Sequence, residues 1–304
     1  MGSGRWDAGA WATYSSASVA GKPTATLFKS TTMGPDYDPA QIALRESRDS
    51  VDNPLSTPII LAADVTGSMG MIADFLMREG LNTLATEIYD RKPVSDPHIM
   101  VAAVGDAEVD RAPLQVTQFE ADIRIAKQVT DLFLERGGGP NRGESYLLPH
   151  LFAARKVKTD AFEKRRKKGY LFSIGDEPFL DGVTKAQAAK FLGLQEKKDL
   201  SAKEIVTLLD PMFEIYHVII GEKASRRPDY RMQLAEWNDL LPQKVIVLDD
   251  YKILAETVVS AIQINEGVSK DVVAGSWDGS TAVVVANAVK SLAQKAASRG
   301  VQRL

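Results

Sequence analysis

Short apolar runs alternate with helical segments over most of the chain, and this alternation limits the folds that the chain can adopt. The apolar runs are Ile59–Ala63, Ile99–Val104, Tyr170–Ile174, Ile215–Ile220 and Val245–Leu248, and the helical segments lie around residues 70–91, 119–136, 145–157, 184–193, 201–209, 229–240 and 250–265. Strands that alternate with helices form βαβ units, so the sequence predicts an α/β fold whose parallel sheet is buried on both faces. Leu114–Phe119 alternates in polarity after a proline, which indicates a short antiparallel strand at the sheet edge.

The two ends of the chain differ from this central part. Residues 1–56 are rich in Gly, Ser, Thr and Pro without a sustained period, which predicts an irregular N-terminal arm. Residues 57–265 are expected to form the main domain, and residues 266–304 a C-terminal extension whose segment 276–298 closes the fold as a helix. Within the main domain, Ser201 and Glu204 have the spacing of a capping box at a helix start.

Composition narrows the classes of protein and site. The net charge of −3 argues against a nucleic-acid binder that uses its whole surface. The absence of Cys excludes disulfides, thiolate metal ligands and a Cys nucleophile. The sequence also has no apolar run near the roughly 20 residues that span a bilayer and no signal-peptide core, so a cytoplasmic protein is expected.

The stretch IILAADVTGSMGMIADFL, residues 59–76, runs from an apolar strand through a polar loop into a helical segment. Such a loop lies at the carboxyl edge of an α/β sheet, where these folds place their sites. The loop lacks the glycine pattern of a dinucleotide site and the lysine of a phosphate-binding P-loop. It offers instead one carboxylate and two hydroxyls at alternate positions, Asp64, Thr66 and Ser68. These are hard oxygen ligands suited to Mg²⁺, Mn²⁺ or Ca²⁺.

The pattern Asp64-Val65-Thr66-Gly67-Ser68 resembles the start of the metal-ion-dependent adhesion site of the von Willebrand factor A (VWA) family, Asp-x-Ser-x-Ser. Thr66 replaces the first Ser, one hydroxyl for another. The resemblance implies a doubly wound, mostly parallel sheet with one antiparallel edge strand and helices on both faces. The order of elements agrees with that fold from about residue 57 to 265.

The resemblance also implies two further parts of the metal site. The later Asp of the family corresponds to Asp176 in YLFSIGDEP, where Gly175 stands at a position usually held by Thr. The remaining ligand follows a glycine pair, and in GGGPNRGESYLLPHL it corresponds to Glu144 or Ser145. Asp106, after the second strand, is expected beside these ligands rather than among them.

Each of these residues also has a simpler interpretation. Asp64 and Ser68 are good caps for the helix that starts near Met69. Glu144 either reaches the metal as an internal third carboxylate or caps the next helix and leaves the metal to Ser145. The basic run EKRRKKG, residues 163–169, is suited to phosphate but is also what a helix C-terminus prefers.

The function expected from the resemblance is a metal-dependent protein-binding module, with Mg²⁺ or else Mn²⁺ or Ca²⁺ in its site. A partner protein would present an Asp or Glu to the metal, and an intracellular adaptor for an AAA+ ATPase is favoured over adhesion. The alternatives are a Mg²⁺-dependent hydrolase and a VWA protein associated with RNA. No acid–base His or Lys is placed by the sequence near the metal loops, so we do not expect an enzyme.

Overall fold

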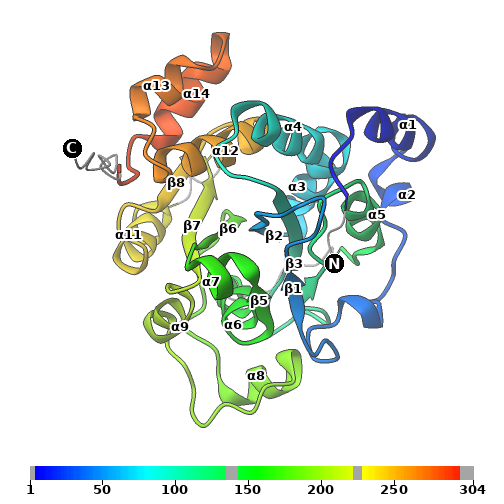
Figure 1. The fold of residues 1–304 in the computed structure, drawn as a ribbon. Helices are drawn as coiled ribbons and strands as arrows, with labels where there is room; N and C mark the ends of the chain where they lie inside the picture. Colours follow the sequence, from blue (N-terminus) through cyan, green and yellow to red (C-terminus); the bar gives the residue numbers. More distant parts are fainter. Residues whose placement is uncertain (1–3, 135–142, 222–227, 295–304) are drawn as a thin grey trace.

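The computed structural model describes residues 4–134, 143–221 and 228–294, and a six-stranded sheet forms its centre (Figure 1). In spatial order the strands are β4 (Leu114–Val116), β3 (Pro97–Val104), β2 (Thr57–Asp64), β6 (Gly169–Gly175), β7 (Phe213–Ile220) and β8 (Val245–Leu248). Neighbouring strands are parallel except for β4, which is antiparallel to β3. The predicted doubly wound, mostly parallel sheet with one antiparallel edge strand is confirmed.

Helices cover both faces of the sheet because successive strand residues point to opposite sides. Ile59 and Leu61 of β2 belong to one hydrophobic core, and Ile60 and Ala62 belong to the other. The first core packs against α3 (Gly70–Phe75), α4 (Leu81–Arg91), α5 (Arg124–Asp131) and α12 (Leu254–Asn265). The second packs against α6 (Leu147–Lys156), α8 (Lys185–Leu192), α9 (Ala202–Leu209) and α11 (Tyr230–Leu240). Two buried faces explain why the strands read as continuous apolar runs.

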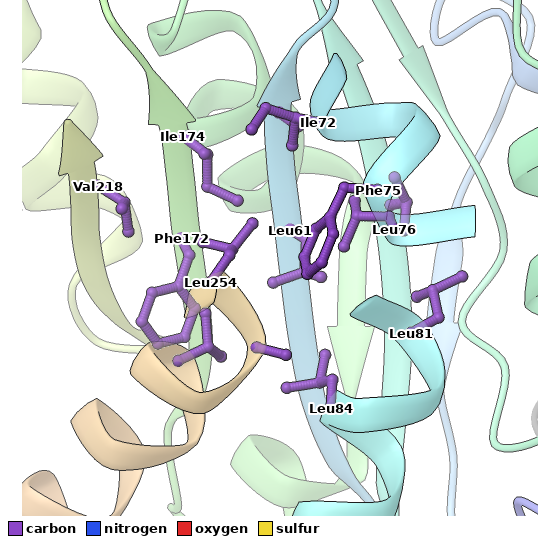
Figure 2. Close-up of a cluster of buried hydrophobic side chains, with 14 of the residues drawn as sticks. Leu61, Ile72, Phe75, Leu76, Leu81, Leu84, Phe172, Ile174, Val218 and Leu254 are labelled. Carbon is purple, nitrogen blue, oxygen red and sulfur yellow. The ribbon is translucent and has the colours of Figure 1, made fainter. Parts of the chain in front are cut away.

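Figure 2 shows part of the first core, where Leu61 and Phe172 of the sheet meet Phe75 and Leu254 of the covering helices. The helical segment expected around 70–91 is present but not uniform. A short 3₁₀ turn, Gly67–Met69, precedes α3, and a π-helical segment, Leu76–Gly80, joins α3 to α4. Buried residues recur along the whole segment, so it lies on the sheet as one continuous element.

The N-terminal segment differs from the irregular arm that its composition predicts. It contains the helices α1 (Ala8–Ser18) and α2 (Thr24–Leu27), the 3₁₀ turn Pro35–Tyr37 and the strand β1 (Arg45–Ser47). The Asp7 side chain caps α1 by accepting from Ala10 N, and Trp11 buries its ring in the first core. One cap and one large buried side chain thus stabilise a helix that has no repeating apolar face.

Two short elements after α6 are absent from the predicted order. The helix expected over 145–157 ends at Lys156, and the chain continues as strand β5 (Val157–Thr159) and helix α7 (Asp160–Arg165). β5 pairs in parallel with β1 in a separate two-stranded sheet. Farther on, the predicted capping box is confirmed, since Ser201 Oγ accepts from Glu204 N at 3.4 Å and Glu204 Oε2 accepts from Ser201 N at 2.9 Å.

The C-terminal part packs on the same core as the main domain. After the 3₁₀ turn Tyr251–Ile253 and α12 come α13 (Lys270–Gly275) and α14 (Gly279–Val289), so the closing helix is shorter than the expected 276–298, part of which lies outside the described residues. Trp277 Nε1 donates to Ser260 Oγ at 2.9 Å, and Ser291 Oγ donates to Val245 O at 2.7 Å. Across the described ranges, no helix combines the length and apolar character needed to cross a membrane.

Candidate metal centre

The carboxyl end of β2 places Asp64 at the topological switch point of the sheet, where later strands are added on opposite sides of β2. The strand before Asp64 pairs with β3 on one side and with β6 on the other, and the side chain of Asp64 is fully buried. Its Oδ1 accepts from Thr66 N and from Thr66 Oγ1, both at 2.8 Å, and its Oδ2 accepts from Tyr146 Oη at 3.1 Å. The N-cap residues of the 3₁₀ turn and of α3, Thr66 and Met69, make no capping hydrogen bond with their side chains, and the hydrogen bonds of Asp64 to Thr66 orient the loop.

The hydroxyl of Thr66 joins two carboxylates from distant parts of the chain. Thr66 Oγ1 lies 2.8 Å from Asp64 Oδ1 and 3.1 Å from Glu144 Oε1. The second oxygen of Glu144, Oε2, is buried and has no hydrogen-bond partner among the described residues. A buried carboxylate oxygen without a partner carries a desolvation cost, which indicates that a positively charged or donating group belongs beside it.

The backbone around Glu144 explains how this residue reaches the site. Gly143 has a φ of 118°, and a Cβ there would lie 2.8 Å from Pro178 O, so only glycine fits without strain. Glu144 N donates to Pro178 O at 2.9 Å, and Leu180 N donates to Glu144 O at 3.1 Å. These bonds fasten Glu144 to the loop that follows β6.

Ser145, the other residue expected at this position, makes hydrogen bonds to residues that follow β3. Its N donates to Gly105 O at 3.2 Å, and its Oγ accepts from Ala107 N at 2.8 Å. Ser145 therefore ties the loop to the end of β3. Of the two adjacent candidates, Glu144 is the one whose side chain contacts Thr66.

Asp106 and Asp176 follow the strands on either side of β2. Asp106 is buried after β3, and its Oδ1 accepts from Glu108 N at 2.8 Å, so it organises its own loop near Glu144. Asp176 is half-buried after β6, close enough for its charge to raise the pKa of Asp64. Ser68 lies in the 3₁₀ turn Gly67–Met69, but its side chain falls outside the described part of the structure.

Burial and mutual repulsion make the two central carboxylates difficult to ionise. Burial raises the pKa of Asp64 to about 7, with a further contribution from Asp176, against the lowering effect of its hydrogen bonds. Burial also raises the pKa of Glu144 to about 9, and the charges of Asp64, Asp106 and Asp110 add to the shift. A cation beside these carboxylates would favour their charged forms.

Tyr146 is a part of the site that the sequence does not reveal. Its ring is fully buried, and its hydroxyl donates to Asp64 Oδ2. A Cβ on Gly175 would lie 1.8 Å from the Tyr146 Oη, so the side chain that Gly175 lacks would occupy the space of this hydroxyl. The departure from the family pattern at Gly175 is the one sequence signal that could have pointed to Tyr146.

The donor set fits a small hard cation held by both carboxylates and hydroxyls. In the described ranges, no three or more carboxylate or imidazole groups are close enough to hold a metal by themselves. Thr66 lies within hydrogen-bond distance of both Asp64 and Glu144, and its hydroxyl is a further oxygen beside these two carboxylates. Such all-oxygen sets suit Mg²⁺ and Mn²⁺.

Comparisons with known proteins yield resemblances of structure only, since no family model and no curated protein matches the sequence. The pilus adhesin SpaC from Lactobacillus rhamnosus GG in its open conformation is similar over 73% of this chain and 31% of its own, with a TM-score of 0.46 and 10% identity. A von Willebrand factor type A protein from Catenulispora acidiphila is similar over 79% of this chain and 52% of its own, with a TM-score of 0.38 and 16% identity. The chain thus spans about a third of the adhesin and about half of the second protein.

Proposed function

We propose that this chain is a metal-dependent protein-binding module whose site is formed by Asp64, Thr66 and Glu144. The observation that carries the proposal is the Thr66 hydroxyl set between two buried carboxylates, one of which has an oxygen without a partner. Neutralising these charges is the simplest reason to gather them at the carboxyl edge of the sheet.

Each residue has a distinct role in this proposal. Asp64 and Glu144 would bind Mg²⁺ or Mn²⁺ through carboxylate oxygens, and Thr66 would add an uncharged hydroxyl. Asp176 and Ser68 complete the set that the family resemblance implies. The bound ion would supply a positive charge that attracts an acidic side chain of a partner protein.

The Glu144 carboxylate bears on how a partner would bind. With Asp64 and Asp176, Glu144 would be a third carboxylate from the chain itself that neutralises the ion and fills a coordination position. An incoming Asp or Glu would have to displace it. In the free protein, Glu144 therefore holds a self-ligated state that a partner opens. The position of Glu144 beside Thr66 supports this form of the proposal.

The proposal also names a class of partner and a cellular compartment. On the resemblance of the Asp64-x-Thr66-x-Ser68 loop to the VWA family, we assign the chain to a cytoplasmic adaptor role with an AAA+ ATPase as partner. Affinity capture with the parent protein and with Asp64→Ala, each with Mg²⁺ or with a chelator, tests this assignment. Capture of an AAA+ ATPase that depends on both Asp64 and Mg²⁺ supports it, and capture independent of both contradicts it.

Calorimetric titration with Mg²⁺ and Mn²⁺ tests the metal site directly. The parent is expected to bind one ion with micromolar to millimolar affinity, and Asp64→Ala is expected to abolish binding. Asp210→Ala, at an exposed carboxylate on the opposite edge of the sheet, is the matched control. Unchanged binding in Asp64→Ala would remove the proposed site.

The rival function, a Mg²⁺-dependent hydrolase, predicts turnover of phosphoesters or nucleotides. All three histidines of the chain are buried, and burial lowers the pKa of each, which disfavours them as proton carriers exposed to a substrate. We expect no hydrolysis above background in standard phosphatase and nucleotidase assays with Mg²⁺. Robust turnover that disappears in Asp176→Ala would favour the enzyme.

A further inference from the structure

A second candidate site lies at the amino edge of the sheet, opposite the candidate metal centre. There the structure forms a cavity of about 410 Å³. It lies between the segment before β2, the loop after α4, the end of α7 and the turn after α12, and its lining includes Leu55, Lys92, Val94, Arg166, Lys167 and Tyr170. Its volume is within the range of about 300–1,000 Å³ typical of small-molecule sites.

Basic side chains from two separate segments converge on this cavity. Lys92 comes from the end of α4, and Arg165, Arg166, Lys167 and Lys168 come from the end of α7 and the residues after it. Glu214 and Glu266 are the carboxylates among the lining residues. The cavity is therefore positively charged in a protein whose net charge is −3.

Internal ion pairs account for only part of this charge. Arg165 donates to Asp49 Oδ2 at 2.6 Å, and Lys168 donates to Asp210 Oδ1 at 3.1 Å. Lys244 donates to Glu214 Oε2 at 2.7 Å, so this carboxylate is already compensated. Glu266 accepts from the hydroxyl of Tyr170.

Three cations remain for an external ligand. For Lys92, Arg166 and Lys167, no carboxylate lies within ion-pair distance in the described part of the chain. All three side chains are exposed, and all three line the cavity. Arg166 Cζ also lies 5.3 Å from the centroid of the Phe162 ring, which leaves its charge without a carboxylate partner. Three cations without a carboxylate partner around one cavity favour an anion with several charged oxygens.

The helix dipoles account for cations at the end of each helix, including Lys92 and Arg166 at the C-caps, but not for the meeting of two such helix ends at one cavity. Cations in the last turn of a helix complement its dipole, which accounts for Arg91 in α4 and for Lys164 and Arg165 in α7. Lys167 lies beyond its helix. Lys92 and Arg166 are the left-handed caps of two different helices, with φ of 50° and 55°, and they line the same cavity.

Apolar side chains in the same cavity favour an organic ligand over a simple inorganic anion. Leu55, Pro93, Val94 and Ala161 contribute to its lining, and Leu55 is 50% exposed. Inorganic phosphate would gain nothing from these groups, whereas a phosphate ester could pack its organic part on them. We propose that this cavity binds a small organic phosphate of about the size of a mononucleotide.

Binding of ADP, AMP and glucose 6-phosphate, measured by calorimetry in a buffer of low ionic strength, tests the proposal. The triple variant Lys92→Gln, Arg166→Gln, Lys167→Gln should weaken binding of the best probe roughly tenfold or more, since it removes charge-assisted contacts to phosphate. The control variant Lys185→Gln, Lys190→Gln, Lys197→Gln makes the same change in net charge at exposed positions around α8 and should bind like the parent.

Pyrophosphate and a single-stranded RNA of 20 nucleotides complete the panel. Weaker binding of pyrophosphate than of ADP supports the organic ligand. Equal binding of pyrophosphate and ADP, an equal loss in both triple variants, binding of RNA alone, or no binding of any small probe at millimolar concentration would each overturn the proposal. Asp64→Ala should bind the probes normally, which separates this site from the proposed metal site.

Discussion

At the scale of single residues, Glu144 decides whether the proposed metal site is open or self-ligated. Glu144→Gln keeps the shape of the side chain and its contact with Thr66 but cannot supply the negative charge that Glu144 would carry beside a bound metal ion. We expect affinity for Mg²⁺ to fall and binding of an acidic partner to become stronger, because the ion is less satisfied from within. Metal titration and affinity capture measure the two effects, with Glu108→Gln as a control at an exposed neighbouring carboxylate. No change in either measurement would rule out self-ligation.

Tyr146 and Gly175 provide a second test at the residue scale, because the Tyr146 hydroxyl occupies the space that a side chain at position 175 would need. Tyr146→Phe removes the hydroxyl that donates to Asp64, so we expect affinity for metal to fall by about 10-fold or more with the fold intact. Gly175→Ala places a methyl group 1.8 Å from the Tyr146 Oη and should destabilise the protein by about 1–3 kcal/mol as well as weaken the site. Urea unfolding and metal titration of both variants separate the two effects. A Gly175→Ala protein as stable as the parent would contradict the packing described.

At the scale of elements, local signals and long-range packing contribute separately to the helices. Helix α9 has a capping box, and Ser201→Ala removes its side-chain acceptor for Glu204 N. We expect a loss of about 1 kcal/mol in the free energy of unfolding, within the range measured for N-cap replacements. Chemical denaturation provides the measurement. Lys203→Ala in the same helix should change the stability by less than about 0.5 kcal/mol, and equal effects of the two substitutions would contradict a specific role for the cap.

Helix α1 is the opposite case, because tertiary contacts dominate it. Trp11 is 7% exposed and packs against Trp6 with ring centroids 5.5 Å apart. Trp6 Nε1 in turn donates to Asn82 Oδ1 of α4 at 3.2 Å. The N-terminal segment is thus part of the first core, although its sequence has no helical repeat of apolar residues.

At the scale of the whole molecule, buried histidines make stability depend on pH. Burial lowers the pKa of His98 to about 4 and of His150 to about 3, and that of His217 well below its usual range. The unfolded chain binds protons at these residues below pH 6.5, and the folded chain does not. Stability is therefore lost as the pH falls from about 6.5 toward 3–4, by up to about 1.4 kcal/mol per pH unit for each histidine.

Asp64 and Glu144 have the opposite effect on the pH dependence of stability in the metal-free protein. The pKa values of Asp64 and Glu144 are raised in the folded state from about 4 to about 7 and about 9, so their favourable contribution to stability is fully present below about pH 4 and is lost progressively as the pH rises to those folded values. The double variant Asp64→Asn, Glu144→Gln should therefore lose stability below pH 6.5 more steeply than the metal-free parent. Thermal unfolding from pH 5 to 9 in the presence of a chelator compares the two proteins. Identical pH profiles would show that these residues are not buried as the structure describes.

The sequence by itself determined the layout of the sheet and one loop of the candidate site. Five apolar runs of strand length, separated by helical segments, were enough to predict the parallel strands, because burial on both faces leaves a continuous apolar pattern. The loop from Asp64 to Ser68 was located in the same way, since the carboxyl end of a buried strand is fixed by the strand. These signals are local, so they can be recognised in a short stretch of sequence without knowing how the rest of the chain folds.

Only the tertiary structure decided which distant groups meet. Glu144 and Ser145 are adjacent in sequence, yet hydrogen bonds to Pro178 and Gly105 turn one toward Thr66 and the other toward the end of β3. The hydroxyl of Tyr146 at Asp64 and the convergence of two basic segments on one cavity likewise depend on chain segments far apart in sequence. The physical reason is that side-chain direction follows from how loops close onto the sheet, and closure depends on packing and hydrogen bonds that no local pattern encodes.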